Sequence, residues 1–164
     1  MKVWIGIDNG ITGSIGVIRE NKTYSLFKTP TIKERNYQKK AQNITRVDGV
    51  KLHKILNDNC VGNDYRLFLE RPLVNPQRFK ATLSAIRAWE ATLIVINLLN
   101  LQYKLVDSRL WQHSLLPNNI QKDELKRFSL DLGVKLFPEV NFKGFKDADA
   151  LLIAEWAKRQ ETCI

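Results

Sequence analysis

Two apolar runs typical of buried β-strands each end on a carboxylate. Residues 3–7 (VWIGI) lead directly into Asp8, and residues 66–69 (RLFL) lead into Glu70. Short apolar runs bounded by turn-forming residues predict strands of a sheet. Ligand sites in open α/β sheets form where strands end, so two neighbouring strands of this kind would bring both carboxylates to the same edge.

The remaining periodicity predicts an α/β fold. Residues 14–18 and 23–28 are strand-forming runs that follow the first one after turn signals, which predicts an antiparallel meander, and residues 103–106 form a further strand. Strands followed by alternating helices and strands favour a sheet covered by helices. The helices expected from apolar spacings of three, four or seven are a helix capped by Asp48, residues 76–100, residues 125–136 and residues 147–159.

The segment between residues 28 and 46 has a different character. It has no clear hydrophobic period, and Glu34 is the only acid that opposes its positive charges, so we predict a mobile basic loop. The positive charges belong to Lys28, Lys33, Arg35, Lys39, Lys40 and Arg46.

The length and the charge restrict the class of protein. A chain of 164 residues is expected to form one domain, residues 1–164. The chain carries a formal net charge of +9, and its isoelectric point is about 9.7. A basic domain of this kind has polyanions as its expected partners.

The cysteine and histidine content excludes two kinds of site. Cys60 and Cys163 are too few for a disulfide scaffold, and they lack the spacing of a metal site. His53 and His113 lie far apart, which argues against a zinc site. No apolar run reaches the ~18 residues that a membrane span requires. We therefore expect free thiols, no membrane association and a cytoplasmic location.

A third acidic group opens the last expected helix, at Asp147 and Asp149 (KDADALLIAEWA). Acids at a helix start also cap free N–H groups, so a structural role explains this group as well. Residues two apart in a helix point about 200° apart, so both carboxylates face one site only if Asp147 precedes the helical turn. Asp8 and Glu70 have a comparable alternative as solvated residues at strand ends.

A cluster of these carboxylates would need a cation. Nearby carboxylates repel one another, and the pKa of at least one of them must rise. A hard divalent ion removes that cost, and oxygen ligands suit Mg²⁺ or Mn²⁺. The acids therefore predict a divalent metal site if the fold brings them together.

Three motifs in this order resemble those of a known family. They are GIDNGITGSIGVI, LFLERP and KDADALLIAEWA, and the segments VNPQRFKATLSAIRAWEATLI and WQHSLLP extend the match over nearly the whole chain. Together they resemble the RuvC-type Holliday junction resolvases, specifically their phage-encoded relatives. The resemblance implies an RNase H-like fold, with a mixed five-stranded sheet and helices on both faces, and usually a homodimer. It also implies Mg²⁺-dependent phosphodiester hydrolysis at four-way DNA junctions.

The resemblance also implies roles for particular residues. The family binds two Mg²⁺ ions, which Mn²⁺ can replace. The positions of its metal ligands correspond to Asp8, Glu70, Asp147 and Asp149. The bacterial pattern has its two helix acids three apart, whereas Lys146 stands three residues before Asp149, which leaves open whether Asp147 is a ligand or a cap. The family's lysine near the scissile phosphate matches Lys122 best, and a solvated first-turn lysine is the alternative.

Basic residues at two places are expected to contact DNA phosphates. Such contacts make binding salt-dependent and mostly blind to sequence. A solvated loop is the less favoured alternative for the basic segment, whereas the solubility of a helix explains the residues of the long helix as well. They are Lys33, Arg35, Lys39 and Lys40 in the basic segment and Arg78 and Lys80 on the long helix.

Three other functions compete with junction resolution. One is an RNase H-like nuclease that acts on RNA-containing, flap or fork substrates, and another is a non-catalytic binder of branched nucleic acid. The third is an ATP-binding domain of the actin and sugar-kinase type. The segment GIDNGITGS also resembles the first phosphate loop of that class. The chain is too short for the two domains of that class and lacks its second glycine-rich motif, so no nucleotide cofactor is expected.

Overall fold

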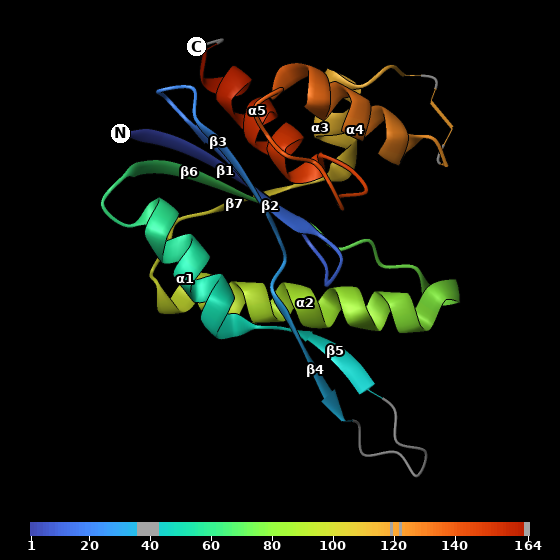
Figure 1. Ribbon diagram of the computed structural model, residues 1–164. Helices are drawn as coiled ribbons and strands as arrows, with labels where there is room; N and C mark the ends of the chain where they lie inside the picture. Colours follow the sequence, from blue (N-terminus) through green and yellow to red (C-terminus); the bar gives the residue numbers. More distant parts are fainter. Residues whose placement is uncertain (36–42, 119, 122, 163–164) are drawn as a thin grey trace.

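A mixed β-sheet forms the centre of the protein. The computed structural model describes residues 1–35, 43–118, 120–121 and 123–162, and the order of its five-stranded sheet is β3-β2-β1-β6-β7 (Figure 1). The strand β1 is antiparallel to β2 and parallel to β6, so the predicted meander and the predicted mixed sheet are both confirmed. The strands are β1 (Lys2–Asp8), β2 (Ser14–Arg19), β3 (Tyr24–Lys28), β6 (Asp64–Glu70) and β7 (Lys104–Val106).

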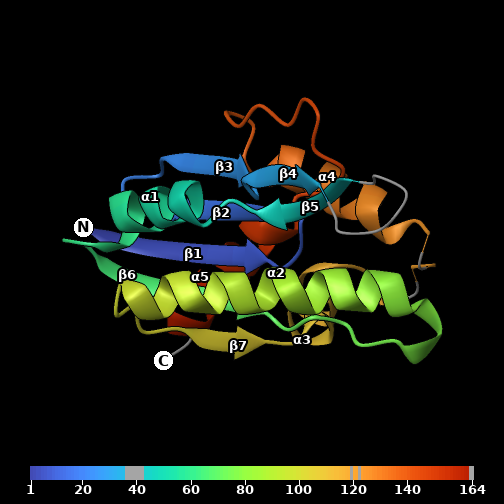
Figure 2. The ribbon, with the colours of Figure 1, turned by 90° about the horizontal axis from the view of Figure 1, so that it is seen from below.

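Helices cover both faces of this sheet. Figures 1 and 2 show α1 and α2 on one face and α3, α4 and α5 on the other. The predicted α/β class, with helices on both faces, is therefore confirmed. The helices are α1 (Gly49–Cys60), α2 (Phe79–Leu98), α3 (Ser108–Leu115), α4 (Leu125–Leu136) and α5 (Asp149–Thr162), with a 3₁₀ turn η1 (Pro76–Arg78) before α2.

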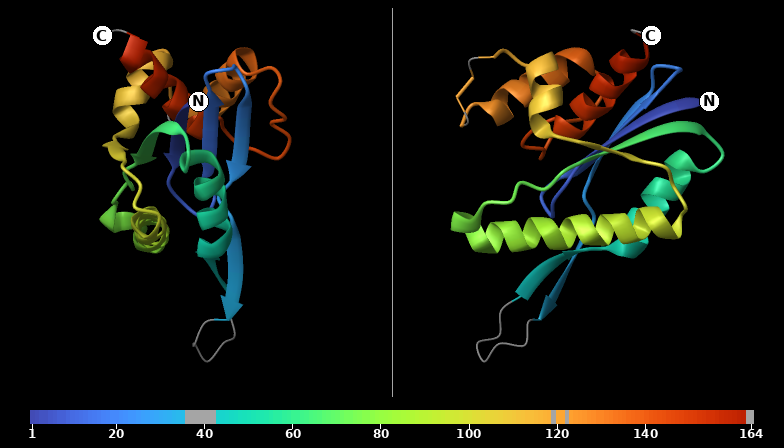
Figure 3. Two further views of the ribbon diagram at one scale, coloured as in Figure 1. Left: turned by 90° about the vertical axis from the view of Figure 1, so that its left-hand side faces the viewer. Right: turned by 180° about the vertical axis from the view of Figure 1, so that it is seen from behind.

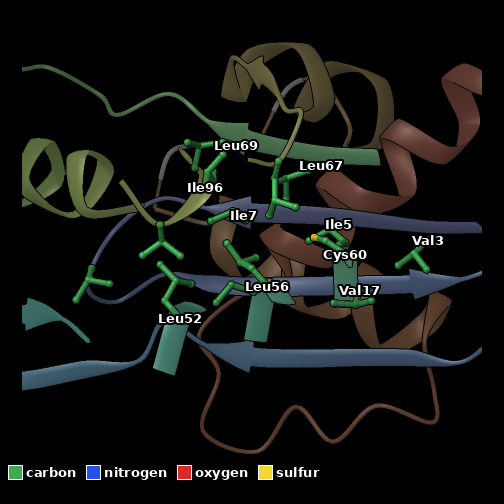
Figure 4. Packing of buried hydrophobic residues seen from close by; sticks show 14 of the residues in the cluster. Val3, Ile5, Ile7, Val17, Leu52, Leu56, Cys60, Leu67, Leu69 and Ile96 are labelled. Carbon is green, nitrogen blue, oxygen red and sulfur yellow. The ribbon is translucent and has the colours of Figure 1, made fainter. Parts of the chain in front are cut away.

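Alternation along β1 divides the core into two layers. Successive side chains of a strand point to opposite faces. Val3, Ile5 and Ile7 therefore pack with α1 and α2, as Figure 4 shows, while Trp4 packs on the other face beneath α5. Asp8, at the end of the same strand, follows the Trp4 alternation and so faces the side of α5.

Two glycines let α5 lie directly on the sheet. Gly6 and Gly16 are paired across β1 and β2, and both face α5. A Cβ atom at Gly6 would lie 2.2 Å from the carbonyl oxygen of Ala150, and one at Gly16 would lie 2.5 Å from the backbone nitrogen of Leu151. No larger residue fits at this contact, which holds the first turn of α5 against the ends of β1 and β2.

The predicted basic loop is instead largely a β-hairpin arm, so that part of the prediction is wrong. The strands β4 (Thr31–Arg35) and β5 (Asn43–Val47) pair antiparallel, and Figure 3 shows them projecting beyond α2. Arg46 and Glu34 form an ion pair of 2.6 Å across the two strands. Both faces of the arm carry polar side chains, so the period of two that marks a half-buried strand is lost from the sequence.

The segment WQHSLLP, for which the sequence predicts no helix, contains most of the helix α3. Trp111 of this helix is fully buried, and it anchors α3 to the face of the sheet that carries α5. The short length of α3 explains why apolar spacing does not predict it, because two turns offer few repeats of the pattern.

The helix α2 buries only part of its surface. Its buried residues are Ala88, Thr92, Val95 and Ile96, and the Thr92 hydroxyl donates a 2.9 Å hydrogen bond to the Ala88 carbonyl. By length and composition alone, Pro76–Leu98 is apolar enough to cross a membrane, since an 18-residue window within it has a mean hydropathy of 1.2, although polar residues interrupt every apolar run in it. An apolar stripe on α2 stays exposed; it consists of Phe79, Leu83, Ile86, Ile94 and Leu98.

Candidate metal centre

The fold brings three acids from distant parts of the sequence together. Asp8 ends β1, while Asp147 and Asp149 stand at the start of α5. Each of the three offers a carboxylate oxygen, and these oxygens all lie within 4.8 Å of one another. The close contact of α5 with Gly6 and Gly16 produces this convergence, because it places the first turn of the helix at the end of β1.

Glu70 joins the cluster from the neighbouring strand. β1 and β6 are parallel, and Ile7 is level with Leu69, so the next residue of each strand is Asp8 and Glu70. The two carboxyl groups are in hydrogen-bond contact. The sequence prediction that neighbouring strands bring both acids to one edge therefore describes the observed geometry.

Asp147 precedes the helix. The helix α5 begins at Asp149, two residues later than the predicted start, and Asp147 lies in the irregular segment before it. This is the condition under which both carboxylates can face one site. Because Asp147 lies outside the helix, the divergence of about 200° between two helical positions does not apply to this pair.

Burial and mutual repulsion raise the pKa of these carboxyls. For Asp8, burial is the larger cause, followed by the charges of Glu70 and Asp149. Burial, then the charge of Asp147, raises the pKa of Asp149 to about 7. Burial also raises the pKa of Glu70. A divalent cation would reverse this cost, and a site of oxygen ligands alone fits Mg²⁺ or Mn²⁺.

Trp111 holds Glu70 in place from α3. Its indole Nε1–H donates a hydrogen bond of 2.9 Å to Glu70 Oε1, and this bond opposes the rise in the pKa of Glu70 that burial causes. The indole ring itself is fully buried. Metal ligands are commonly oriented by hydrogen bonds of this kind.

Ser129 of α4 performs the corresponding role for Asp149. Its hydroxyl donates a hydrogen bond to Asp149 Oδ1 and accepts one of 3.1 Å from the backbone N–H of Ala148. Ser129 is almost completely buried, so these contacts have no competition from solvent. A single hydroxyl thus joins α4 to the start of α5 and orients one acid of the cluster.

A lysine lies beside the cluster on the same helix. Lys126 Nζ is 3.1 Å from Asp147 Oδ2. Partial burial opposes the charged form, but the hydrogen bond to Asp147 and the charges of Asp147, Asp149 and Asp8 outweigh it and raise the pKa of Lys126. Lys122, for which the sequence predicts the lysine role, lies outside the residues that the structure describes.

Comparison with known proteins relates this arrangement to a fold. Neither a protein-family model nor a curated protein sequence matches the chain. Among solved structures, Thermus thermophilus RuvC in complex with a Holliday junction substrate gives a TM-score of 0.58 at 15% identity, over 99% of this chain and 98% of that one. The fold is that of RuvC. A second T. thermophilus RuvC structure gives the same TM-score of 0.58 at 15% identity, over 98% of this chain and 97% of the other.

In this RuvC-like fold, two hollows reach the acids. The larger hollow, of about 470 Å³, is bordered by Glu70, Arg71, Arg78 and Lys126, and we name it the Glu70 hollow. The smaller one, of about 270 Å³, we name the Lys28 hollow; it is lined by Thr12, Ser14, Lys28, Lys146 and Asp147, among others. Thr12 borders both hollows, and each reaches the acids, one at Glu70 and the other at Asp147.

The predicted DNA-contacting residues are dispersed over the RuvC-like fold. Lys33 and Arg35 are exposed on the arm, and Arg78 and Lys80 are exposed where η1 meets α2. Of these four, Arg78 borders the Glu70 hollow. Lys39 and Lys40 lie outside the described residues.

Sequence reasoning missed several side chains that the RuvC-like fold gathers around the acids. Arg71 carries the one available signal, since it directly follows the acid that ends β6. No spacing in the sequence identifies the others. They are Trp111, Ser129, Lys126 and Lys28.

Proposed function

We propose that the protein is a metal-dependent, structure-selective endonuclease that resolves Holliday junctions and related branched DNA by paired nicks, in DNA recombination and repair. The observation that carries this proposal is the convergence of Asp8, Asp147 and Asp149 within 4.8 Å at the end of a RuvC-like sheet. Two further facts support it: one RuvC neighbour is bound to a Holliday junction substrate, and the motifs resemble those of phage-encoded resolvases.

The acids suit a site for two Mg²⁺ ions, with Mn²⁺ as a substitute. Asp8, Glu70, Asp147 and Asp149 are the residues that would hold the ions. When bound there, the ions would supply an activated water molecule and charge to stabilise the departing oxygen of a phosphodiester. Trp111 and Ser129 keep two of the carboxylates oriented, and Lys126 keeps its proton beside Asp147, where its charge faces an incoming phosphate.

The basic side chains mark a path for DNA away from the acids. Arg71 and Arg78 border the Glu70 hollow, and Lys80 is exposed on the next turn of α2. Lys33 and Arg35 extend the positive charge along the arm. Contacts of this kind position a phosphate backbone without reading its sequence, which agrees with selection of the substrate by shape.

Paired nicks on opposed strands require two matched sites, so we propose a homodimer. The exposed stripe of α2 is complementary to a second copy of itself when two α2 helices pack antiparallel about a point between Ala88 and Trp89. Phe79 then lies opposite the partner's Leu98, and Leu83 lies opposite the partner's Ile94. Arg87 and Glu90 are both exposed, and Arg87 of each copy then lies opposite Glu90 of the other, where the two can form ion pairs.

We further propose that the enzyme works in the cytoplasm, without a membrane or a nucleotide cofactor. Cys60 is a free, buried thiol, and burial raises its pKa to about 12. The raised pKa keeps the Cys60 thiol protonated and inert, and a free cysteine rather than a disulfide is typical of a reducing compartment.

A cleavage assay on three substrates tests the proposed activity. We expect paired nicks with Mg²⁺ on a synthetic four-way junction and none on a linear duplex or an RNA–DNA hybrid, and EDTA should abolish the nicks. Asp8→Asn and Glu70→Gln should bind the junction without cutting it. Cutting of the hybrid or of flaps would favour the other RNase H-like activities, and binding without cutting in any divalent metal would leave a non-catalytic binder.

A further inference from the structure

Four polar side chains form one row across the edge of the sheet. In the strand register, Ser14 of β2 is paired with Asp8 of β1 on one side and with Lys28 of β3 on the other. Glu70 of β6 continues the row beyond Asp8. Directly paired residues point to the same face with Cβ atoms about 5 Å apart. The order across the sheet is therefore Lys28, Ser14, Asp8 and Glu70.

The chemistry of this row changes at its middle. Asp8 and Glu70 form the anionic half, which suits cations. Ser14 and Lys28 form the other half, which offers a hydroxyl and an ammonium group. Both of these residues line the Lys28 hollow, which reaches the acid cluster at Asp147.

The Ser14 hydroxyl has an unmet hydrogen-bonding need. Ser14 is only 3% exposed, and its Oγ finds no hydrogen-bond partner among the residues that the structure describes. A buried polar group without a partner is costly, and such groups mark places where a ligand or water binds. Here the hydroxyl lies between the acid at the end of β1 and the ammonium group on β3.

Lys28 is held at the hollow by an aromatic ring rather than by an acid. Its Nζ lies 5.4 Å from the centroid of Phe145, and among the described residues no carboxylate lies within ion-pair distance of it. Gly144, at a φ of 83°, passes so close that a Cβ there would lie 3.1 Å from Nζ. The turn before α5 thus supports the ammonium group and leaves its charge to be neutralised by a ligand.

We propose that Ser14 and Lys28 form a phosphate subsite for the DNA strand that is cut. Ser14 lies one strand from Asp8, and Lys28 lies two strands, about 10 Å, from the strand that carries Asp8. It binds a phosphate close to the scissile one, with Lys28 supplying charge and Ser14 donating a hydrogen bond. This inference rests on the proposed nuclease function, and it names a part of the substrate contact that the acids do not provide.

Neutral phosphates test the subsite. In an Asp8→Asn background, which prevents cutting, junction affinity is measured with one phosphate of the cut strand at a time replaced by an uncharged methylphosphonate. We expect Lys28→Met to weaken binding of the unmodified junction about tenfold. With Lys28 present, a methylphosphonate at one position near the cut should also weaken junction binding about tenfold. In the Lys28→Met variant, the same methylphosphonate should not weaken junction binding further.

Matched variants separate this contact from general charge. Lys22 lies in the turn between β2 and β3, at the other end of the same hairpin, and Lys22→Met should bind the junction normally. Ser14→Ala should share the sensitivity of Lys28→Met at the same modified position, with a smaller loss. Inorganic phosphate is then added as a competitor of the junction. If the subsite takes only phosphates of the DNA strand, the competition should be equal for Lys28→Met and Lys22→Met. If free phosphate also enters the subsite, the competition should be stronger for Lys22→Met, which keeps Lys28.

Three results would overturn the subsite. The first is normal junction binding by Lys28→Met. The second is a loss of junction affinity in Lys28→Met that adds equally to the effect of every methylphosphonate position. The third is a weaker Mn²⁺ affinity, measured by calorimetry, when Lys28→Met is made in the otherwise unaltered protein. Failure of the nuclease function has a different signature. In that case the unaltered protein would leave the junction uncut, while the position-specific effect of Lys28→Met on binding would persist.

Discussion

Trp111 and Glu70 are joined by a hydrogen bond of 2.9 Å from the indole Nε1–H to the carboxylate Oε1. The two residues are far apart in the sequence, on α3 and at the end of β6. Because the ring is fully buried, it has little freedom to move, and it fixes the direction in which the carboxylate presents its other oxygen.

Trp111→Phe should weaken metal binding. The substitution keeps most of the ring volume and removes the donor, so we expect an affinity for Mn²⁺ about tenfold lower in titration calorimetry. Trp89→Phe is the matched control, because the Trp89 Nε1–H is buried without a hydrogen-bond partner among the described residues. An unchanged Mn²⁺ affinity for Trp111→Phe would show that Glu70 does not depend on the indole.

Ser129→Ala should lower both stability and metal affinity. It leaves the Ala148 N–H and one Asp149 oxygen without their partner, and a loss of this kind costs about 1–3 kcal/mol in the free energy of unfolding. Urea denaturation measures this loss, and Mn²⁺ titration measures the effect on Asp149. Ser84→Ala on α2, at a half-buried serine away from the acids, provides the comparison and should change neither quantity.

Gly16→Ala should destabilise the protein through α5. The new Cβ would meet the backbone of Ala150 and Leu151 at about 2.5 Å, so the helix must move away from the sheet. Overpacking of this kind typically costs about 1–3 kcal/mol, which thermal unfolding detects. Gly49→Ala is the control, since a Cβ there meets only Val95 Cγ2 at 3.8 Å. Equal melting temperatures for the two variants would contradict the close contact.

The metal-free protein should lose stability as the pH rises from about 4 to about 7. In the folded state the pKa of Asp149 is about 7, against 3.8 for an unperturbed aspartate, so the folded protein binds a proton in this window that the unfolded chain has released. Stability therefore falls with rising pH. Metal ions compete with the same proton, so stabilisation by Mn²⁺ should grow over this window. Melting temperatures measured with and without Mn²⁺ test both trends, and Asp149→Asn should reduce both, while the raised pKa values of Asp8 and Glu70 keep part of the pH dependence.

Charge reversal tests the proposed dimer. Arg87→Glu or Glu90→Arg alone places like charges opposite each other across the axis, so each should shift the protein toward the monomer in light scattering. The double variant restores opposite charges and should restore the dimer. A monomer in every case would contradict the α2 interface, and binding of the unaltered protein to lipid vesicles would assign the exposed stripe to a membrane instead.

The local pattern of the sequence was sufficient to predict the fold class and the acids that meet. Strands of the meander and the long helix follow from hydrophobic periodicity, because that periodicity reflects which side of each element is buried. Asp8 and Glu70 could be paired in advance because each directly follows a buried strand. The arm β4–β5 and the helix α3 were not predicted, because the first is polar on both faces and the second is too short to show a period.

Only the tertiary structure decided which side chains serve those acids. Trp111, Ser129 and Lys126 reach the cluster because α3 and α4 pack against α5, and nothing in their spacing along the chain encodes that contact. Lys28 joins the same edge through the register of three strands. The sequence by itself determined what each element buries, since burial is a local property of hydrophobicity. The contacts between elements arise from packing over the whole sheet, and packing has no local signature.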